Sequence, residues 1–382
     1  MAPYLGQIED IPESLSLPAA GKLLKAKVAA VTDNTSEQNA LSWEGADFID
    51  NEASFIYSLS EVEKVEVTKA LESFLALELD GDAVSPDNFH LPTLGPCLSR
   101  LTTDLHAGKG FFVIRGLNPA DFSDEDNLIL FLGLSSYIGG VRGKQTNDGS
   151  MLGHLHNAQR ITSTQLARPL KYSKRSAEFH NDIGCDIIGM HVRSLAARGG
   201  DHLVSSVAKI SDHISRIRPD LADALFAPDW RFDLQRHWSD TETRAILFLT
   251  DDGRVLSSII PDALQGVLSS GSSKLTAQQA EALATFQQVA TQHQLRIESR
   301  PGDLMFINNW AVVHGREAFE DDVHQRRYLV RLWLRNEQLA WPLPEPLRIA
   351  SHMVFYDETV PEKWNIHHLD DVKFEVYERL AP

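Results

Sequence analysis

The strongest constraint on the fold of this chain comes from two short segments that lie far apart in the sequence, one around His180 and Asp182 and the other around His314. In an extended segment the side chains alternate between two faces, so His180 and Asp182 point one way and Asn181 points the other. If the fold brings His314 beside them, two imidazoles and one carboxylate can hold one side of a metal ion. That arrangement suits non-haem Fe(II), because it leaves positions open for a co-substrate and for dioxygen (O2).

A predicted strand downstream of His314 has one apolar face and one arginine-rich face. Over Arg327–Arg335 the even positions carry Tyr328, Val330, Leu332 and Leu334, whereas the odd positions include Arg327, Arg331 and Arg335. An apolar face packs in a core, and arginines beside a metal site can hold carboxylates through charge-assisted hydrogen bonds. The pattern therefore predicts an iron site next to an arginine clamp for a dicarboxylate co-substrate.

A resemblance to a known family rests on five residues in this order: His180, Asp182, His314, Arg327 and Arg331. With them the chain resembles the Fe(II)/2-oxoglutarate dioxygenases of the taurine dioxygenase type, the TauD/TfdA superfamily. The segments Gly199–Ser206 and Arg331–Glu337 are similar to a fungal branch of that superfamily. The resemblance implies a mainly β fold with flanking helices, the double-stranded β-helix or jelly roll of clavaminate synthase-like enzymes, with Fe(II), 2-oxoglutarate and O2 as cofactor and co-substrates.

The resemblance also implies roles for individual residues. His180, Asp182 and His314 would bind the iron, and Arg327 would hold the distal carboxylate of 2-oxoglutarate. Relatives carry a threonine that donates to the same carboxylate, two positions after a glycine pair, and here that position is His202. A histidine can replace the donor if its tautomer or charge is right.

The expected reaction couples decarboxylation of 2-oxoglutarate to succinate with oxidation of a substrate C–H bond by hydroxylation, desaturation or cyclisation. Arg331 would hold an anionic group of a small-molecule substrate, which fungal relatives suggest is an amino acid of secondary metabolism. A catabolic dioxygenase acting on sulfonates or aryloxyalkanoates is the alternative. The intact ligands and clamp speak against a further reading, a non-catalytic β-helix binding module.

The loop-rich region between Ser135 and Ser173 precedes the predicted metal strand and in related enzymes contributes to the substrate pocket. Its candidate lining residues are Arg142, Gln145, His156 and Asn157. His154 and His156 also share a face of an extended segment, so a cupin-type metal site is a rival to the site at His180. Cys185 and His191 are expected to be structural.

Residues 1–44 are interpreted as an N-terminal arm, 45–355 as a single catalytic domain with a helical N-terminal part, and 356–382 as a C-terminal tail. Capping boxes predict helices that begin after Ser60 and after Thr276. Further helices are expected over Leu94–His106, near Glu125–Leu134, and over residues 206–227 with a break at Pro219. Residues 110–116 are predicted to form a buried strand. Residues 295–298 and 304–307 are predicted to form a hairpin that places His314 at the metal.

The net charge of −17 and the pI near 5.3 argue against nucleic acid as a partner, because a polyanion requires a basic surface. Two cysteines do not form a disulfide framework. The N-terminus lacks a signal-peptide pattern, and no segment approaches the roughly 18 apolar residues of a membrane span. A cytoplasmic location is therefore expected, without a membrane partner. A homo-oligomer is possible, since the sequence leaves the oligomeric state open.

Overall fold

The computed structural model describes residues 40–157, 174–236, 239–264 and 275–366. All of them belong to one unit of the chain, Glu37–Pro382. The predicted N-terminal arm up to residue 39 and the predicted tail from residue 367 lie outside the described residues. Residues 40–44 pack on the domain, because Leu41 and Trp43 are buried and the Trp43 indole Nε1–H donates to the Lys109 carbonyl.

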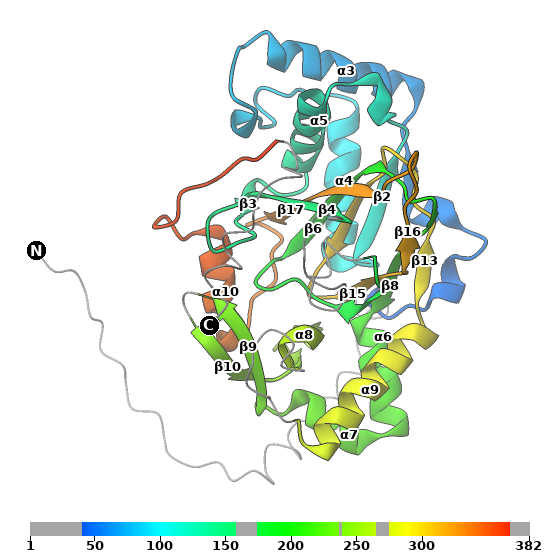
Figure 1. The fold of residues 1–382 in the computed structure, drawn as a ribbon, viewed down its shortest axis with the longest axis vertical. Coiled ribbons are helices and arrows are strands. Elements are labelled where there is room, and N and C mark those ends of the chain that lie inside the picture. Colours follow the sequence, from blue (N-terminus) through cyan, green and yellow to red (C-terminus); the bar gives the residue numbers. More distant parts are fainter. Residues whose placement is uncertain (1–39, 158–173, 237–238, 265–274, 367–382) are drawn as a thin grey trace, which may run out of the picture. The chain divides into compact units, whose positions relative to one another are not determined.

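A large sheet of seven strands forms the centre of the fold (Figure 1), in the order β1-β2-β14-β6-β17-β3 with β4 also paired to β17. Its neighbours are antiparallel except for β1 and β2. The strands are β1 (Ile56–Ser58), β2 (Phe111–Arg115), β3 (Val141–Gly143), β4 (Leu152–His156), β6 (Ile187–Ser194), β14 (Leu304–Asn308) and β17 (Tyr328–Arg335).

A smaller antiparallel sheet of four strands has the order β13-β8-β15-β5. Its strands are β5 (Ala177–His180), β8 (His202–Ser206), β13 (Leu295–Ile297) and β15 (Val312–Arg316). Three two-stranded ribbons complete the described strands: β7 (Arg198–Gly199) with β16 (Phe319–Glu320), β9 (Trp230–Arg236) with β10 (Ser239–Arg244), and β11 (Leu247–Leu249) with β12 (Val255–Ser257).

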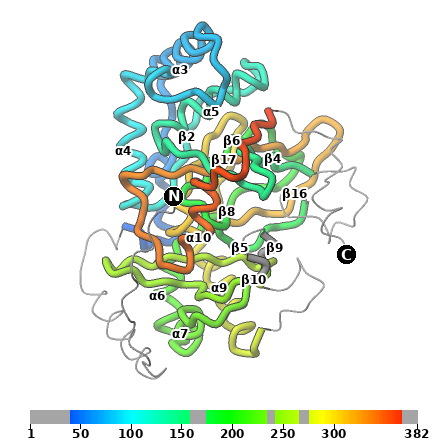
Figure 2. Tube along the Cα trace, turned by 90° about the vertical axis from the view of Figure 1, so that its left-hand side faces the viewer, coloured from blue at the N-terminus to red at the C-terminus, as the bar shows by residue number. Residues whose placement is uncertain are grey.

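Helices lie on both sides of the strands. Helices α3 (Glu61–Leu75), α4 (Leu94–Ala107) and α5 (Asp124–Ser136) lie on one side of the large sheet, and α6 (Val207–Ile217), α7 (Pro219–Phe226) and α9 (Ala277–Gln292) lie beside the small sheet (Figures 1 and 2). The remaining helices are α8 (Pro261–Leu264) and α10 (Glu345–Phe355), with the short 3-10 helices Gly45–Phe48, Glu52–Ser54, Gly81–Ala83 and Pro119–Asp121.

The alternation of side chains along β17 divides the hydrophobic core into two clusters. Val330, Leu332 and Leu334 pack with the apolar side chains of α3, α4 and α5. Leu329 and Trp333 belong to the other cluster, which includes residues of both sheets. The predicted two-faced strand is confirmed, and its arginine-bearing face looks toward the small sheet.

Most predicted elements are present at nearly the expected bounds, including α4, β2, α5, α9 and the break between α6 and α7. Ser60 caps α3 as expected, although Val62 and Val65 of the predicted apolar stripe are exposed. The predicted hairpin is wrong: β13 pairs with β8 in the small sheet, whereas β14 pairs with β2 and β6 in the large one. Within the described part of the chain, no helix combines the length and the apolar character needed to cross a membrane.

Candidate metal centre and anion pocket

His180, Asp182 and His314 converge at one point, with their ligand atoms within 4.8 Å of one another. The β-sheet explains the convergence, because His314 on β15 lies directly opposite His180 at the end of β5. Side chains opposite each other on paired strands point to the same face, and the two imidazole centroids are 4.2 Å apart. Asp182 follows two residues after His180 and completes the group.

Two asparagines fix the backbone around the ligands. The Asn309 side chain accepts from the Asp182 backbone N–H at 2.8 Å and donates to the carbonyls of Asp182 and Cys185. Asn181 points away from the ligands, as predicted, and its amide donates to the carbonyls of Asn309 and Val312. The segments that bear Asp182 and His314 are therefore tied together by buried hydrogen bonds, which the sequence analysis missed. The Asn308-Asn309 pair ahead of His314 was the available signal.

The charge states of the ligands suit a divalent cation. Burial alone raises the pKa of Asp182, but Arg331, His314 and His180 outweigh burial and hold the pKa below its ordinary value. Burial, with a smaller effect of His180, lowers the pKa of His314 to about 3. The site therefore presents one carboxylate and a neutral His314 at neutral pH.

The ring nitrogens are also available for a metal ion. His180 Nδ1 lies 2.7 Å from the Glu178 carbonyl, which can only accept, so Nδ1 carries the proton and Nε2 keeps its lone pair. His314 Nδ1 is buried and has no hydrogen-bond partner among the described residues. Two histidines and one carboxylate in this arrangement fit Fe(II).

A second feature is a buried guanidinium, Arg327, that has no carboxylate hydrogen-bonded to its side chain in the described part of the chain. Its Nη1 has no partner there, its Nε donates to the Gly200 carbonyl at 3.3 Å, and its Nη2 lies 3.5 Å from His202 Nε2. Burial and the neighbouring Arg316 lower the pKa of Arg327 to about 9, so the guanidinium is still charged at neutral pH. A buried charge with an unused donor is costly unless an anion pairs with it.

His202 is buried beside this guanidinium. Burial, then Arg327, lowers the pKa of His202 well below its ordinary value, so the imidazole is neutral. Its Nδ1 lies 2.9 Å from the Ser299 hydroxyl, which can set the tautomer. The Arg327 guanidinium can only donate, so in this structure His202 Nε2 accepts from Arg327 Nη2 and Nδ1–H donates to the Ser299 hydroxyl.

A glycine and an aromatic ring lie against the Arg327 guanidinium. Gly200 has a φ of +88°, and a Cβ there would lie 3.1 Å from atoms of both Arg327 and Phe319. The Phe319 ring lies under the guanidiniums of Arg316 and Arg327, with centroid distances of 4.8 and 5.5 Å. Sequence reasoning did not identify Arg316 or Phe319.

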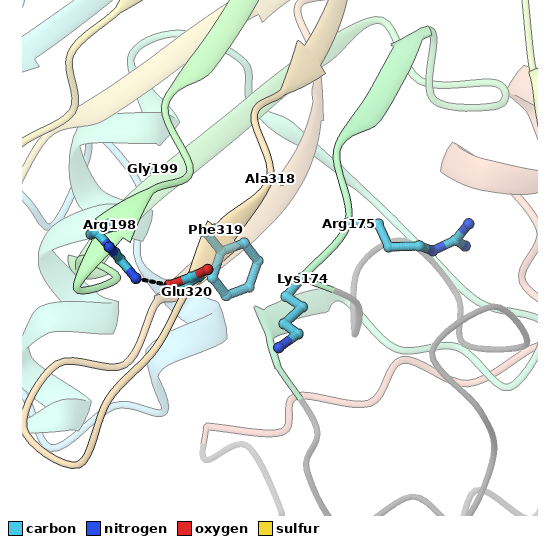
Figure 3. A pocket seen from close by; sticks show the side chains of 7 residues that line it. All are labelled: Lys174, Arg175, Arg198, Gly199, Ala318, Phe319 and Glu320. Carbon is cyan, nitrogen blue, oxygen red and sulfur yellow. Dashed lines mark hydrogen bonds and ion pairs between the residues drawn. The ribbon is translucent and has the colours of Figure 1, made fainter.

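Phe319 also lines a cavity of about 500 Å³ on the surface. Its other lining residues are Lys174, Arg175, Arg198, Gly199, Ala318 and Glu320. Figure 3 shows Arg198 paired with Glu320 across one side of this cavity, while the Arg175 side chain points away from Phe319. The cavity is therefore separate from the three metal ligands.

Arg331 and Gln145 lie at the metal centre. Arg331 Nη1 is 2.8 Å from Asp182 Oδ2, and Arg331 Nε donates to Gln145 Oε1 at 2.8 Å. Arg331 thus faces the site as predicted, and its guanidinium contacts a metal ligand. Gln145, predicted to line the substrate pocket, is buried and holds Arg331.

Arg142, also predicted to line the pocket, lies elsewhere. It pairs with Leu334 across β3 and β17 and so shares the helix-covered face of the sheet, opposite to Arg331. Its terminal nitrogens donate to the carbonyls of Asp82 and Val84. The strand pairing, which sequence does not show, decides this placement.

The rival histidine pair on β4 does not reach the metal centre. His154 and His156 pair with Val330 and Tyr328, residues of the helix-covered face. Both ring nitrogens of His154 already have partners, the Tyr328 hydroxyl and the Asn365 carbonyl. Asn157 is the last residue before a gap in the described chain, and its Oδ1 is buried without a partner in the described part.

Comparisons with known proteins agree with this geometry. The model of the family described as "Taurine catabolism dioxygenase TauD, TfdA family" matches residues 76–333. The taurine hydroxylase-like protein SAT17 of Stachybotrys chartarum is 32% identical over 340 residues, which are 85% of this chain and 86% of that protein.

Solved structures share the fold. Asparagine oxygenase in complex with Fe(II), (2S,3S)-3-hydroxyasparagine and succinate has a TM-score of 0.59 at 18% identity, covering 73% of this chain and 93% of that one. The non-haem iron oxygenase OrfP with Fe and α-ketoglutaric acid has a TM-score of 0.51 at 17% identity, covering 73% and 93%. Its complex with Fe, succinate and (3S)-hydroxy-L-Arg has a TM-score of 0.55 at 15% identity, covering 73% and 94%. The predicted double-stranded β-helix is thereby confirmed.

Proposed function

Because this chain belongs to the TauD, TfdA family of dioxygenases, we propose that it is an Fe(II)- and 2-oxoglutarate-dependent oxygenase that oxidises a C–H bond of a small anionic molecule. The observation that carries the proposal is the combination of a His–Asp–His cluster with the buried Nη1 of Arg327, which has no hydrogen-bond partner among the described residues. A metal site and an unpaired buried cation together suit a co-substrate that has a chelating end and a distal carboxylate.

The residues of the metal centre and those around Arg327 have separate roles in this proposal. His180, Asp182 and His314 would hold Fe(II), which with 2-oxoglutarate and O2 supplies the oxidising chemistry and yields succinate and carbon dioxide. Arg327 would pair with the distal carboxylate of 2-oxoglutarate. Once Arg327 turns its Nη2 to the bound carboxylate, His202 would accept from Ser299 at Nδ1 and donate a second hydrogen bond to that carboxylate from Nε2, in place of the threonine expected from the family.

The proposed substrate is a small amino acid. Two structural neighbours, asparagine oxygenase and OrfP, were solved with hydroxylated amino acids. In this chain Arg331 supplies a guanidinium beside the metal ligands, and Asn157 supplies a buried amide oxygen near the end of β4 that has no partner in the part of the chain that the structure describes. Arg331 would attract a substrate carboxylate, and Asn157 would accept from an ammonium group. A role in secondary metabolism and a cytoplasmic location belong to the same proposal.

The decisive experiment is an anaerobic titration of the Fe(II)-loaded protein with 2-oxoglutarate. We expect the weak visible charge-transfer band of the chelate, and succinate after exposure to oxygen. Arg327→Ala should lose 2-oxoglutarate binding, whereas Arg142→Ala, which removes a half-buried arginine on the opposite face of the sheet, should retain it. Absence of the band in protein with verified iron would contradict the proposal.

Metal binding tests the rival site directly. His180→Ala should abolish stoichiometric Fe(II) binding, and His156→Ala should leave it intact. The reverse result would favour a cupin-type site at His154 and His156. If both variants retained iron binding, neither the site at His180 nor the site at His154 and His156 would be the metal centre.

The substrate class is tested by stimulation of succinate formation. A panel of free amino acids is compared with taurine and with an aryloxyacetate, each at equal concentration. We expect stimulation by amino acids. Stimulation by taurine or the aryloxyacetate alone would instead support the catabolic alternative.

A further inference from the structure

The two oxygens of the Asp182 carboxylate have unequal hydrogen bonding. Oδ2 accepts from the Trp333 indole Nε1–H at 2.7 Å and lies 2.8 Å from Arg331 Nη1. Among the described residues, Oδ1 has one such contact, to the same Arg331 Nη1 at 3.0 Å. Because each donor occupies lone-pair density, Oδ1 is the oxygen with more capacity left for a metal ion.

Both donors are themselves held in place. Trp333 is buried in the core between the two sheets, which fixes the direction of its N–H. The Gln145 amide donates to the carbonyls of Met151 and Arg331 and accepts from Arg331 Nε. Gly153 leaves room for this contact, since a Cβ there would lie 2.5 Å from Gln145 Oε1.

The unequal hydrogen bonding of the two Asp182 oxygens matters because a metal ion has a limited number of coordination positions. Two histidines and one carboxylate oxygen leave three of six octahedral positions, enough for a bidentate co-substrate and for dioxygen. A carboxylate bound through both oxygens would leave only two. We propose that Trp333 is a positioning residue which, with the Gln145–Arg331 pair, keeps Asp182 bound through a single oxygen and so keeps one position free for dioxygen. The inference rests on the proposed function.

The test uses nitric oxide as a stand-in for dioxygen. Anaerobic Fe(II) protein is saturated with 2-oxoglutarate and titrated with nitric oxide, and the iron–nitrosyl complex is followed by electron paramagnetic resonance. Trp333→Phe removes the N–H and keeps an aromatic ring. We expect Fe(II) and 2-oxoglutarate binding close to wild type, and nitric oxide binding weakened about tenfold or more, as for the loss of one charge-assisted hydrogen bond.

Trp341→Phe is the matched control. Trp341 is 3% exposed, compared with 2% for Trp333, and its Nε1–H donates to the His106 carbonyl instead of to a metal ligand. Its nitric oxide titration should match wild type. Gln145→Leu should weaken nitric oxide binding in the same direction as Trp333→Phe, because Arg331 loses its support.

Three outcomes separate the explanations. Equal nitric oxide affinity in Trp333→Phe, Trp341→Phe and wild type overturns the inference. A wild-type protein that binds iron but not 2-oxoglutarate overturns the proposed function first. If Trp333→Phe does not fold, benzothienylalanine at position 333 replaces the N–H by sulfur at nearly the same shape, and normal nitric oxide binding in that protein overturns the inference equally.

Discussion

His202 illustrates how burial converts an ionisable side chain into a neutral hydrogen-bonding group. The imidazole lies between Ser299 and Arg327, and its pKa is held well below the ordinary value by burial and then by the guanidinium. A charged imidazole would repel Arg327, whereas a neutral one can accept from Arg327 and, in its other tautomer, donate to a bound carboxylate. The substitution of histidine for the family's threonine is therefore compatible with binding of a carboxylate.

We expect the binding of 2-oxoglutarate to be independent of pH between about pH 8 and about pH 6. A histidine with an ordinary pKa near 6.5 would gain charge between about pH 8 and about pH 6 and would tighten the binding of a carboxylate as the pH falls. Because the pKa of His202 is well below that range, the dissociation constant of 2-oxoglutarate should stay constant across it. Calorimetric titration of metal-saturated protein at each pH checks this. Tighter binding at the lower pH would show that His202 titrates.

Single residues also show the limit of sequence reasoning. The ligands His180 and Asp182 and the face of Arg331 follow from the alternation of a strand, which is a local property. The hydrogen bond from Trp333 to Asp182 depends on how β17 lies against the loop after β5. Arg142 lies away from the metal centre because it pairs with Leu334. Such relations between distant segments cannot be read from spacing.

At the scale of elements, the turn between β7 and β8 connects backbone conformation to the anion pocket. Gly199 and Gly200 have φ values of +67° and +88°, a region that L side chains rarely adopt. The turn brings Gly200 so close to Phe319 and Arg327 that a Cβ at position 200 would lie 3.1 Å from atoms of both. The turn was predictable from the glycine pair, but its contact with Arg327 was not.

Gly200→Ala should therefore destabilise the fold and weaken 2-oxoglutarate binding together. We expect a loss of about 1–3 kcal/mol in the free energy of unfolding, from the strained backbone and the contact with Arg327. Gly140→Ala is the control, because a Cβ at Gly140 meets no atom within 4 Å. Urea unfolding and a 2-oxoglutarate titration measure both effects. Equal behaviour of the two variants would contradict the assignment.

The helices were the more predictable elements, since their signals are local. The Ser60 hydroxyl accepts from the Glu63 backbone N–H, and the Glu63 carboxylate accepts from the Ser60 backbone N–H at 2.8 Å. The failed hairpin shows the opposite case. Residues 295–297 and 304–308 are consecutive strands, but they belong to different sheets. The alternation of their side chains is the same whether the two strands pair with each other or pass from one sheet to the other.

Ser60→Ala should lower the stability of the protein through its effect on α3. Loss of an N-cap costs about 1 kcal/mol, because a backbone N–H at the helix start loses its partner. Ser73→Ala is the control, since Ser73 is exposed in the same helix and alanine is the better helix former. Urea denaturation should therefore show a lower midpoint for Ser60→Ala and an equal or higher one for Ser73→Ala.

At the scale of the molecule, the core buries two ionisable groups, His191 and Asp186, whose pKa values in the folded protein differ from the ordinary values. His191 on β6 lies among apolar side chains, 5.6 Å from Phe131 between ring centroids, and burial followed by Arg193 lowers its pKa to about 3. Asp186 is the opposite case, with a pKa raised to about 6 by burial despite Arg335 and Trp310. The stability of the whole domain should depend on pH through these groups.

The direction of the His191 effect follows from proton binding. Below about pH 6.5 an unfolded histidine takes up a proton that folded His191 refuses, so the folded state loses up to about 1.4 kcal/mol per pH unit from this residue. Asp186 acts against it below about pH 6, because its folded carboxyl takes up a proton before the unfolded one does. His191→Leu should therefore have a shallower loss of unfolding free energy between about pH 6.5 and about pH 5 than wild type. Since Asp186 is present in both proteins, its contribution cancels in the comparison.

The control is His90→Gln, which changes an exposed histidine and should retain the wild-type slope. Urea unfolding at each pH measures the stability of wild type and of both variants. If His191→Leu and wild type lose stability in parallel, His191 is not the group that makes the core sensitive to acid.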